Sequence, residues 1–308
     1  MNAPVRIRTC SIWRSLEVVG DTPTLLVIEA SWLGERRFDG FRQRTGLLKA
    51  LLSDRLKKLV AAGLFEKRQY CDAPPRFEYV MTTKGRDLYW TSLMMLRWET
   101  GWAKSGNITV ELTHKTCGHR FVADPACGSC GETISAFEVD WREGPGVGLM
   151  APSYSRRRQQ RHSPETATSL MNESAQLMGD RWASLIMRSI FTNLYRFDEI
   201  RQDTAIATNI LSERLKWLEL IGVIRQRTDP ASPSTTQYRV TRKGVEYYPV
   251  LLMLMIWGDR YYASPEGAPV LLFHKNCGGP LNPKVVCSHC REPIVSTDVE
   301  YTIGSKAP

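Results

Sequence analysis

Residues 47–63, LLKALLSDRLKKLVAAG, decide the fold that this sequence predicts. As a helix, this segment has a polar and charged face opposite an apolar one. Gly63 is suited to ending that helix. Taken alone, the segment is typical of an ordinary amphipathic helix that packs one face on a core. That face is formed by four leucines at spacings of four, four and three residues: Leu48, Leu52, Leu56 and Leu59.

The neighbouring stretches place this helix in a larger motif. A short helical pattern over residues 38–45 precedes it, and two strand-like runs, 64–70 and 77–82, follow it. Helix, turn, helix and hairpin is the order of a winged helix-turn-helix, in which the second helix enters the DNA major groove. The sequence therefore predicts a recognition helix followed by a β-hairpin wing.

The same pattern occurs twice at a constant offset of 159 residues. For example, Gly20-Asp21 returns as Gly179-Asp180, and Arg37-Phe38-Asp39 returns as Arg196-Phe197-Asp198. A constant offset indicates a duplication with almost no internal insertion. We therefore expect an α+β protein, mainly α with small β wings. It would contain two tandem winged helix-turn-helix domains, each followed by a small zinc-ribbon-like tail, over residues 1–142 and 165–308 with a linker at 143–164.

Composition agrees with two soluble globular domains and a polyanionic partner. The chain has 308 residues, 43% of them hydrophobic, and a formal net charge of +9. The longest apolar run, 250–257, is far short of the roughly 18 residues that suggest a membrane span. The first ten residues show no apolar core of a signal peptide, so we expect a cytoplasmic protein with no membrane association. The basic balance favours double-stranded DNA as partner, because phosphates attract lysine and arginine.

The candidate DNA-contacting residues lie on the recognition helices, ahead of them and on the first wing. Lysine can donate to guanine and asparagine can pair with adenine, so the two helices are expected to prefer different bases. For the arginines, a solvated surface position is an equal alternative to a phosphate contact. The first repeat contributes Arg37, Lys49, Ser53, Arg55, Lys57, Lys58, Arg68 and Arg76, and the second contributes Arg196, Thr208, Asn209, Ser212, Arg214 and Lys216.

Two histidine-cysteine clusters follow the wings. Each reads His-x2-Cys, nine residues, then Cys-x2-Cys, which is the spacing of paired zinc ligands on tight turns. The pattern predicts one structural zinc per cluster, two per chain, with redox or vestigial cysteines as the alternatives. The expected ligands are His114, Cys117, Cys127 and Cys130 in the first cluster and His274, Cys277, Cys287 and Cys290 in the second.

The sequence resembles the HxlR-type family of bacterial winged helix-turn-helix transcriptional regulators. The resemblance is carried by Arg37-Phe38-Asp39, by residues 52–59 (LSDRLKKL), by residues 74–79 (PPRFEY) and by Lys84-Gly85. It implies control of nearby genes by dimers joined through their terminal helices. Some members of the family sense oxidants or electrophiles through a cysteine near the first helix, a place that Cys10 matches.

These observations favour a sequence-specific DNA-binding transcriptional regulator that is not an enzyme. One chain would act as a pseudo-dimer, with the terminal helices at 84–102 and 243–262 docked together and two recognition helices reading an imperfect palindrome. A homodimer of two such chains is an alternative. A protein-interaction adaptor without specific DNA binding is the second hypothesis. Four ligands per cluster argue against catalytic zinc, which usually keeps an open position.

Overall fold

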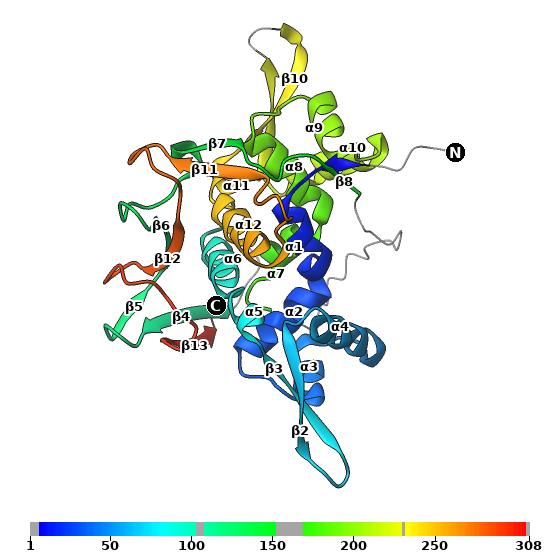
Figure 1. Ribbon diagram of the computed structural model, residues 1–308, viewed down its shortest axis with the longest axis vertical. Helices are drawn as coiled ribbons and strands as arrows, with labels where there is room; N and C mark the ends of the chain where they lie inside the picture. The colour runs from blue at the N-terminus through cyan, green and yellow to red at the C-terminus, as the bar shows by residue number, and fades with distance from the viewer. Residues whose placement is uncertain (1–5, 103–107, 152–168, 230–231, 306–308) are drawn as a thin grey trace. The chain divides into compact units, whose positions relative to one another are not determined.

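The computed structural model describes residues 6–102, 108–151, 169–229 and 232–305, and the chain forms two compact units (Figure 1). Each unit combines segments from both sequence repeats, so neither follows the continuous ranges 1–142 and 165–308. Unit 1 comprises Met1–Glu17, Pro125–Arg157 and Asp180–Lys284, and unit 2 comprises Val18–Asp124, Arg158–Gly179 and Val285–Pro308.

Unit 2 contains the winged helix-turn-helix of the first repeat, in the predicted order of elements. The helix before the recognition helix spans the predicted residues, and the predicted terminal helix is divided into a short and a long helix. The elements are α2 (Thr22–Trp32), α3 (Phe38–Thr45), α4 (Lys49–Ala61), β2 (Phe65–Cys71), β3 (Arg76–Met81), α5 (Thr83–Arg86) and α6 (Tyr89–Trp102).

Local interactions fix the ends of these helices. The Asp21 carboxylate accepts a hydrogen bond from the Thr24 backbone N–H at 3.0 Å and thereby caps α2. Gly63 follows α4 with φ of +74°, a left-handed conformation that favours glycine. Leu52, Leu56 and Leu59 are buried, as their spacing predicts. Leu48 is 76% exposed, because it stands one residue ahead of the helix, so its predicted place on the buried face is wrong.

Segments from elsewhere in the chain complete unit 2. Helix α7 (Asn172–Gly179) packs on α2 and α6. The Glu99 carboxylate of α6 accepts hydrogen bonds from the backbone N–H groups of Glu173 and Ser174, at 3.0 and 2.8 Å. It thereby satisfies donors that the first turn of a helix leaves unpaired. A three-stranded antiparallel sheet follows the order β13 (Val299–Ser305), β4 (Ile108–His114), β5 (His119–Phe121).

Unit 1 repeats the arrangement around the winged helix-turn-helix of the second repeat. Pro249 lies in the first turn of the long helix α12, where a proline leaves the helix intact. The elements are α8 (Arg181–Phe191), α9 (Phe197–Thr204), α10 (Thr208–Leu220), β9 (Ile224–Asp229), β10 (Ser232–Val240), α11 (Arg242–Val245) and α12 (Tyr248–Tyr262).

The first helix of the chain packs on the last helix of this unit. Helix α1 spans Ser11–Val19, with residues up to Glu17 in unit 1. The Ser11 hydroxyl donates to the Asp259 carboxylate, and the Ser15 hydroxyl donates to the Leu254 carbonyl at 3.1 Å. The contact requires glycine at position 258, because a Cβ atom there would lie 2.3 Å from the Ser11 carbonyl oxygen.

Strands near the middle of the sequence complete unit 1. β7 (Val139–Glu143) pairs antiparallel with β11 (Val270–His274), with Trp141 opposite Leu272. β1 (Ile7–Arg8) pairs with β8 (Leu149–Met150), inside the predicted linker, and residues 152–164 of that linker lie outside the described residues. The remaining elements are β6 (Ala123–Cys127), the 3-10 helix η1 (Ala136–Glu138) and β12 (Pro283–Cys287).

Within the described residues, the longest helix is α12, with 15 residues. No helix in this part of the chain has both the length and the apolar character needed to cross a bilayer.

Candidate nucleic-acid interface and metal centres

Helix α4 presents a polar face beside its buried leucines. Lys49, Lys57 and Lys58 are exposed, and Ser53 is half-buried on the same helix. The Lys58 ammonium lies 2.9 Å from the Asp54 carboxylate one turn earlier. Both side chains are exposed to solvent, so a DNA phosphate could take the place of Asp54 as the partner of Lys58. The predicted first-repeat residues of this helix, with the exception of Arg55, thus form an accessible polar surface.

Arg55 lies inside the fold of unit 2. Its Nε atom lies 2.8 Å from an Asp21 carboxylate oxygen, and its side chain is 18% exposed. A second ion pair joins it to Asp54, its neighbour on α4. Because Asp21 also caps α2, the guanidinium links the start of α2 to the recognition helix. We therefore assign Arg55 to the positioning of α4 rather than to the DNA-contacting set.

Helix α10 presents a different polar face in unit 1. Thr208, Asn209 and Lys216 are exposed, and Ser212 is half-buried. Arg214 repeats the geometry of Arg55, since its Nε lies 2.5 Å from the carboxylate of Asp180, the cap of α8. The same ion pair thus joins the recognition helix to the capping aspartate in both repeats.

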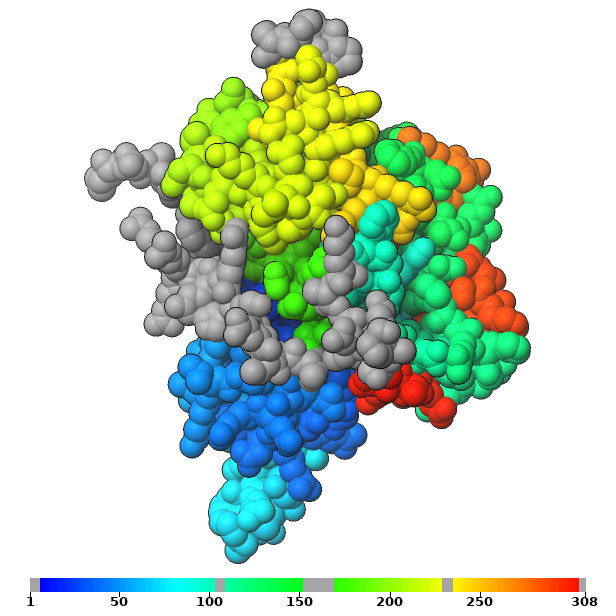
Figure 2. All heavy atoms as spheres, turned by 180° about the vertical axis from the view of Figure 1, so that it is seen from behind, coloured from blue at the N-terminus to red at the C-terminus, as the bar shows by residue number. Residues whose placement is uncertain are grey.

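The first wing is exposed and basic. The space-filling view shows β2–β3, in cyan, projecting from the blue helices of its own unit (Figure 2). Arg68 is exposed and pairs with Glu66 at 2.7 Å, and Arg76 is exposed near the tip. The guanidinium of Arg37, ahead of α3, lies 4.5 Å from the ring centre of Tyr70, which holds it beside the wing.

The second wing carries two exposed arginines that the sequence reasoning missed. Arg225 and Arg227 lie on β9. The repeat offset could have found one of them, since Arg227 is the equivalent of Arg68 (227 − 159 = 68). Arg196 is exposed ahead of α9, where its backbone N–H donates to the Glu199 carboxylate at 2.9 Å. Both wings are therefore basic surfaces.

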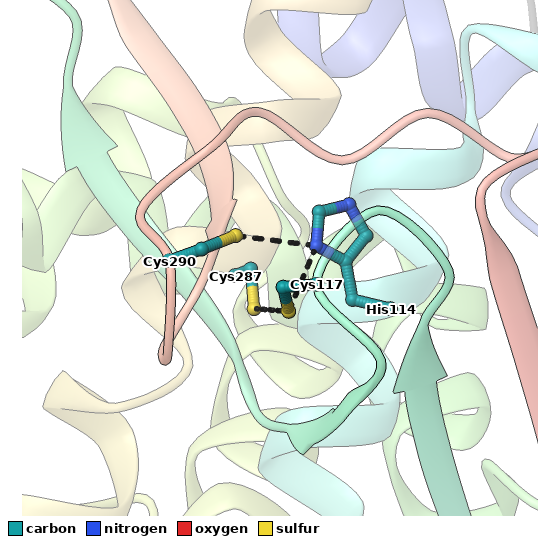
Figure 3. Close-up of side chains that lie close together, drawn as sticks. All are labelled: His114, Cys117, Cys287 and Cys290. Carbon is teal, nitrogen blue, oxygen red and sulfur yellow. Dashed lines mark hydrogen bonds between the residues drawn. The ribbon is translucent and has the colours of Figure 1, made fainter.

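Unit 2 contains a group of four ligand-type side chains that could hold a metal ion (Figure 3). All four ligand atoms lie within 4.8 Å of one another. His114 Nδ1 lies 3.6 Å from Cys117 Sγ and 3.3 Å from Cys290 Sγ, and Cys117 Sγ lies 4.0 Å from Cys287 Sγ. Tetrahedral ligands about 2.0–2.3 Å from zinc are separated by roughly 3.5–3.8 Å, so these spacings are close to those of a zinc site.

Unit 1 contains the matching group, formed by Cys127, Cys130, His274 and Cys277. His274 Nδ1 lies 3.3 Å from Cys130 Sγ and 3.6 Å from Cys277 Sγ. The donor set is again three thiols and one imidazole nitrogen, and both histidines are buried. Each group therefore has the four-ligand composition of a closed structural site.

The predicted grouping of these ligands along the chain is wrong. Each His-x2-Cys pair of one repeat meets the Cys-x2-Cys pair of the other repeat, so neither group is a contiguous cluster. The spacing within each pair fixes only a local turn. The strands between the two pairs, β5 and β6 in the first repeat and β12 in the second, carry the pairs of each repeat into different units.

The same tight turn carries all four ligand pairs. The N–H one residue after each pair donates to the carbonyl of the first ligand, as in Gly118 to His114 at 2.7 Å. Gly118, Gly131 and Gly278 have φ between +68° and +76° in this turn. Arg291, where the sequence departs from glycine, has φ of +63°, so the turn is kept at the cost of some backbone strain.

The pKa of one thiol in each group is lowered from its usual value. The backbone N–H of Glu292 is the main cause of the lowered pKa of Cys290. For Cys127, burial opposes ionisation, but the backbone N–H groups of Cys130 and Ser129 outweigh it and lower the pKa. Thiolates are the form in which cysteine binds metals.

Cys10 is buried, 4% exposed, at the start of α1. It lies beside Arg188 of α8, where the two groups interact electrostatically. The low exposure restricts direct attack on this thiol by an oxidant from solvent. The possible redox role of Cys10 stays a prediction.

Two winged helix-turn-helix units, each with an accessible second helix beside a basic wing, define a helix-turn-helix protein with the surfaces that this class uses on DNA. The chain belongs to the HxlR-like helix-turn-helix family, whose family model matches residues 18–107 and 177–266, one match in each repeat.

Known proteins resemble parts of this chain. An uncharacterised HTH-type transcriptional regulator of Mycobacterium bovis is 33% identical over 129 residues, which cover 42% of this chain and 82% of that protein. The HTH-type regulator YvaP of Bacillus subtilis is 31% identical over 90 residues, 29% of this chain and 83% of its own length. The solved structure of diamide-treated YodB from B. subtilis is 30% identical, covers 31% of this chain and 94% of that one, and superposes with a TM-score of 0.26.

Proposed function

We propose that the protein is a sequence-specific DNA-binding transcriptional regulator. The observation that carries the proposal is the pair of helices α4 and α10, each with a buried leucine face and an exposed polar face, and each followed by a basic wing. The family membership and the net charge of +9 support the same function.

Each recognition helix would contact base edges in the DNA major groove, and each wing would contact the DNA phosphate backbone. Lys49 in the first turn of α4 can donate to guanine O6 and N7, whereas Asn209 in the first turn of α10, at the position of Ala50, can pair with adenine. The exposed arginines of the wings, Arg68 and Arg76 in unit 2 and Arg227 in unit 1, would contact phosphates. Arg68 would exchange Glu66 for a phosphate, since its present partner is exposed.

The two helices belong to one chain, so we propose that one chain reads both halves of an imperfect palindrome as a pseudo-dimer. In a dimeric relative, identical helices read identical half-sites about one helical turn apart. Here the exposed first turns differ, with Lys49 and Ala50 in one helix and Thr208 and Asn209 in the other. The half-sites should therefore differ at the bases that these side chains meet.

We propose that both His/Cys groups bind structural zinc. The three thiols and one imidazole of each group, with separations of 3.3–4.0 Å among the measured pairs, match a closed tetrahedral set. Each site would join a ligand pair from one repeat to a pair from the other. Zinc would thus bind together segments that lie far apart in the sequence.

Selection of bound duplexes from a random DNA pool by the purified full chain tests the DNA-binding function. We expect an enriched two-part sequence, with affinity that falls steeply as salt rises because phosphate contacts release counterions. Lys49→Ala and Arg76→Ala should weaken binding to the selected duplex, and Lys49→Ala should also relax the base preference of one half-site. Arg120→Ala, on the exposed strand β5, is the matched control and should leave binding unchanged.

No enrichment of any sequence, together with salt-insensitive or absent DNA binding, would contradict the proposal. That result would favour an adaptor that uses its winged domains for protein contacts.

A further inference from the structure

Unit 1 contains a largely apolar, partly open cavity of about 70 Å³ between α1, α8, α12, β7 and β11. A single water molecule needs at least about 10–15 Å³ on this scale, so the cavity exceeds the space of one water, and because it is partly open a bound molecule could extend beyond it. Most of the lining is aliphatic or aromatic, and it includes Val139, Trp141, Phe191, Leu251 and Leu272. A polar edge is formed by Arg8, Cys10 and Arg188.

Arg188 brings unpaired donors to this edge. The residue is 7% exposed, and its Nη2 donates to the Asp203 carboxylate at 2.5 Å. Among the described residues, no oxygen or nitrogen atom accepts a hydrogen bond from its Nε or Nη1, and the neighbouring acceptor is the Cys10 thiol, a weak one. A buried donor without an acceptor costs about 1–3 kcal/mol, and more when the donor is charged. A ligand that supplies an acceptor would remove this cost.

The charges around the cavity favour an anion. Arg8 Nε also binds Asp203, at 2.8 Å, so two guanidiniums share a single carboxylate. The other acidic group at the cavity, Asp259, accepts the Ser11 hydroxyl, and burial raises its pKa although Arg14 nearby acts in the opposite direction. Burial alone would lower the pKa of Arg188, but Cys10 and Asp203 beside it raise it, so Arg188 stays protonated. One negative charge would balance the second guanidinium.

We propose that this cavity binds a small hydrophobic carboxylic acid as its anion, with the carboxylate on Arg188 and the hydrocarbon or aromatic body against Trp141 and Phe191. Charge-assisted hydrogen bonds to a guanidinium are among the stronger polar contacts available in a desolvated site. A concave apolar lining with a few convergent polar groups is typical of a small-molecule site.

The other repeat lacks the chemistry for the same ligand. The repeat offset makes Glu29 the equivalent of Arg188 (188 − 159 = 29) and Arg44 the equivalent of Asp203 (203 − 159 = 44). The Glu29 carboxylate accepts hydrogen bonds from the Ser169 hydroxyl at 2.9 Å and the Leu170 N–H at 2.8 Å. Glu29 provides no guanidinium donor for a carboxylate and already has hydrogen-bond partners, so we expect one ligand per chain.

The site adjoins the elements that lead to the recognition helix of unit 1. Asp203 lies at the end of α9, and α10 begins at Thr208. A carboxylate on Arg188 would compete with Asp203 for the same guanidinium and could change how α9 is held against α8. This regulatory consequence rests on the proposed DNA-binding function, whereas ligand binding itself does not.

Calorimetric titration of the full chain with benzoate, phenylacetate and hexanoate tests the proposal without DNA. At least one acid should bind saturably with one site per chain, and the neutral amide of that acid should bind at least tenfold more weakly. Arg188→Gln should weaken the acid at least tenfold and leave the amide unchanged. Glu29→Gln, the change at the equivalent position of the other repeat, is the matched control and should bind the acid as the native chain does.

A second variant keeps the test decisive if Arg188→Gln does not fold. Leu272→Trp keeps the arginine and fills the cavity, and it should abolish binding while the metal content stays unchanged. The proposal is overturned if none of the three acids binds, if the amide binds as tightly as the acid, or if Leu272→Trp binds like the native chain. If an acid binds but does not change the affinity of the chain for a DNA duplex that it is known to bind, the ligand site is confirmed and only the regulatory consequence is wrong.

Discussion

The Nδ1 atom of His114 lies 3.3 Å from the Sγ atom of Cys290, although 176 residues separate them in the sequence. The same exchange places His274 Nδ1 3.3 Å from Cys130 Sγ in the other unit. Each ligand group therefore ties one repeat to the other within a single compact unit. A zinc ion at each site would make every unit depend on both repeats for its stability.

Stepwise removal of ligand pairs should reveal the exchanged grouping. Replacing His114 by Ala and Cys117 by Ser should lower the zinc content from about two ions per chain to about one. Adding Cys287→Ser and Cys290→Ser should cause no further loss, because these residues belong to the same group. Adding Cys127→Ser and Cys130→Ser instead should lower the content to about zero. Elemental analysis of protein purified without added metal measures each step. If the zinc content instead falls to about zero with the Cys287 and Cys290 changes and stays at about one with the Cys127 and Cys130 changes, each site is formed within one repeat.

Arg55→Ala should lower the free energy of unfolding of unit 2, because Arg55 binds Asp21 inside the fold and is not expected to contact DNA. The variant removes the 2.8 Å ion pair with Asp21, and we expect a loss of about 1 kcal/mol in the free energy of unfolding because both side chains are about four-fifths buried. Urea denaturation measures the loss.

Lys57→Ala, on the exposed face of α4, should leave the free energy of unfolding unchanged. It should reduce the salt dependence of DNA binding by about one phosphate contact. Similar salt slopes for Lys57→Ala and the native chain would remove Lys57 from the interface.

Stability should fall as pH rises through the range in which Glu29 ionises. Burial is the main cause that raises its pKa from 4.5 to about 7, against the hydrogen bonds from Leu170 and Ser169, which lower it. Between these values the folded chain holds a proton that the unfolded chain has lost, so the free energy of unfolding decreases with pH. From pH 5.5 to 8 the expected decrease is about 2 kcal/mol. The free energy of unfolding, measured by urea denaturation, should fall by this amount more in the native chain than in Glu29→Gln over this pH range. Parallel pH profiles of the two proteins would refute the assignment.

Exchange of the first-turn residues of α10 should change one half-site only. Thr208→Lys with Asn209→Ala gives α10 the equivalents of Lys49 and Ala50. Duplex selection with this variant should shift the base preference in the half-site that α10 reads and leave the other half-site as it was. A selected operator with two identical halves from the native chain, or a change in both halves from the variant, would argue against the pseudo-dimer.

Cys10 provides a test of redox sensing. If the thiol is the sensor, mild peroxide or a quinone should weaken DNA binding by the native chain and leave Cys10→Ser unaffected. The response should be slower than that of an exposed thiol, because the Cys10 side chain is 4% exposed. An equal loss in both proteins would instead point to the thiols of the metal groups.

The sequence by itself determined the local elements and the duplication. Leucine spacing located α4, glycine at position 63 located its end, and the constant offset of 159 residues located the second copy. These signals are local or repeated, so they need no knowledge of the path of the chain. The His-x2-Cys and Cys-x2-Cys pairs were equally local, and their turns form as such pairs require.

Only the tertiary structure decided which pair meets which, since two copies of the same pair have the same spacing and chemistry. The choice follows from long-range strand pairing, of β4 with β13 in unit 2 and of β7 with β11 in unit 1. The positioning role of Arg55 and the cavity at Arg188 were equally hidden, because each depends on side chains far apart in the sequence. Periodicity records which face of an element is buried, whereas the partner on that face is fixed by packing of the whole unit.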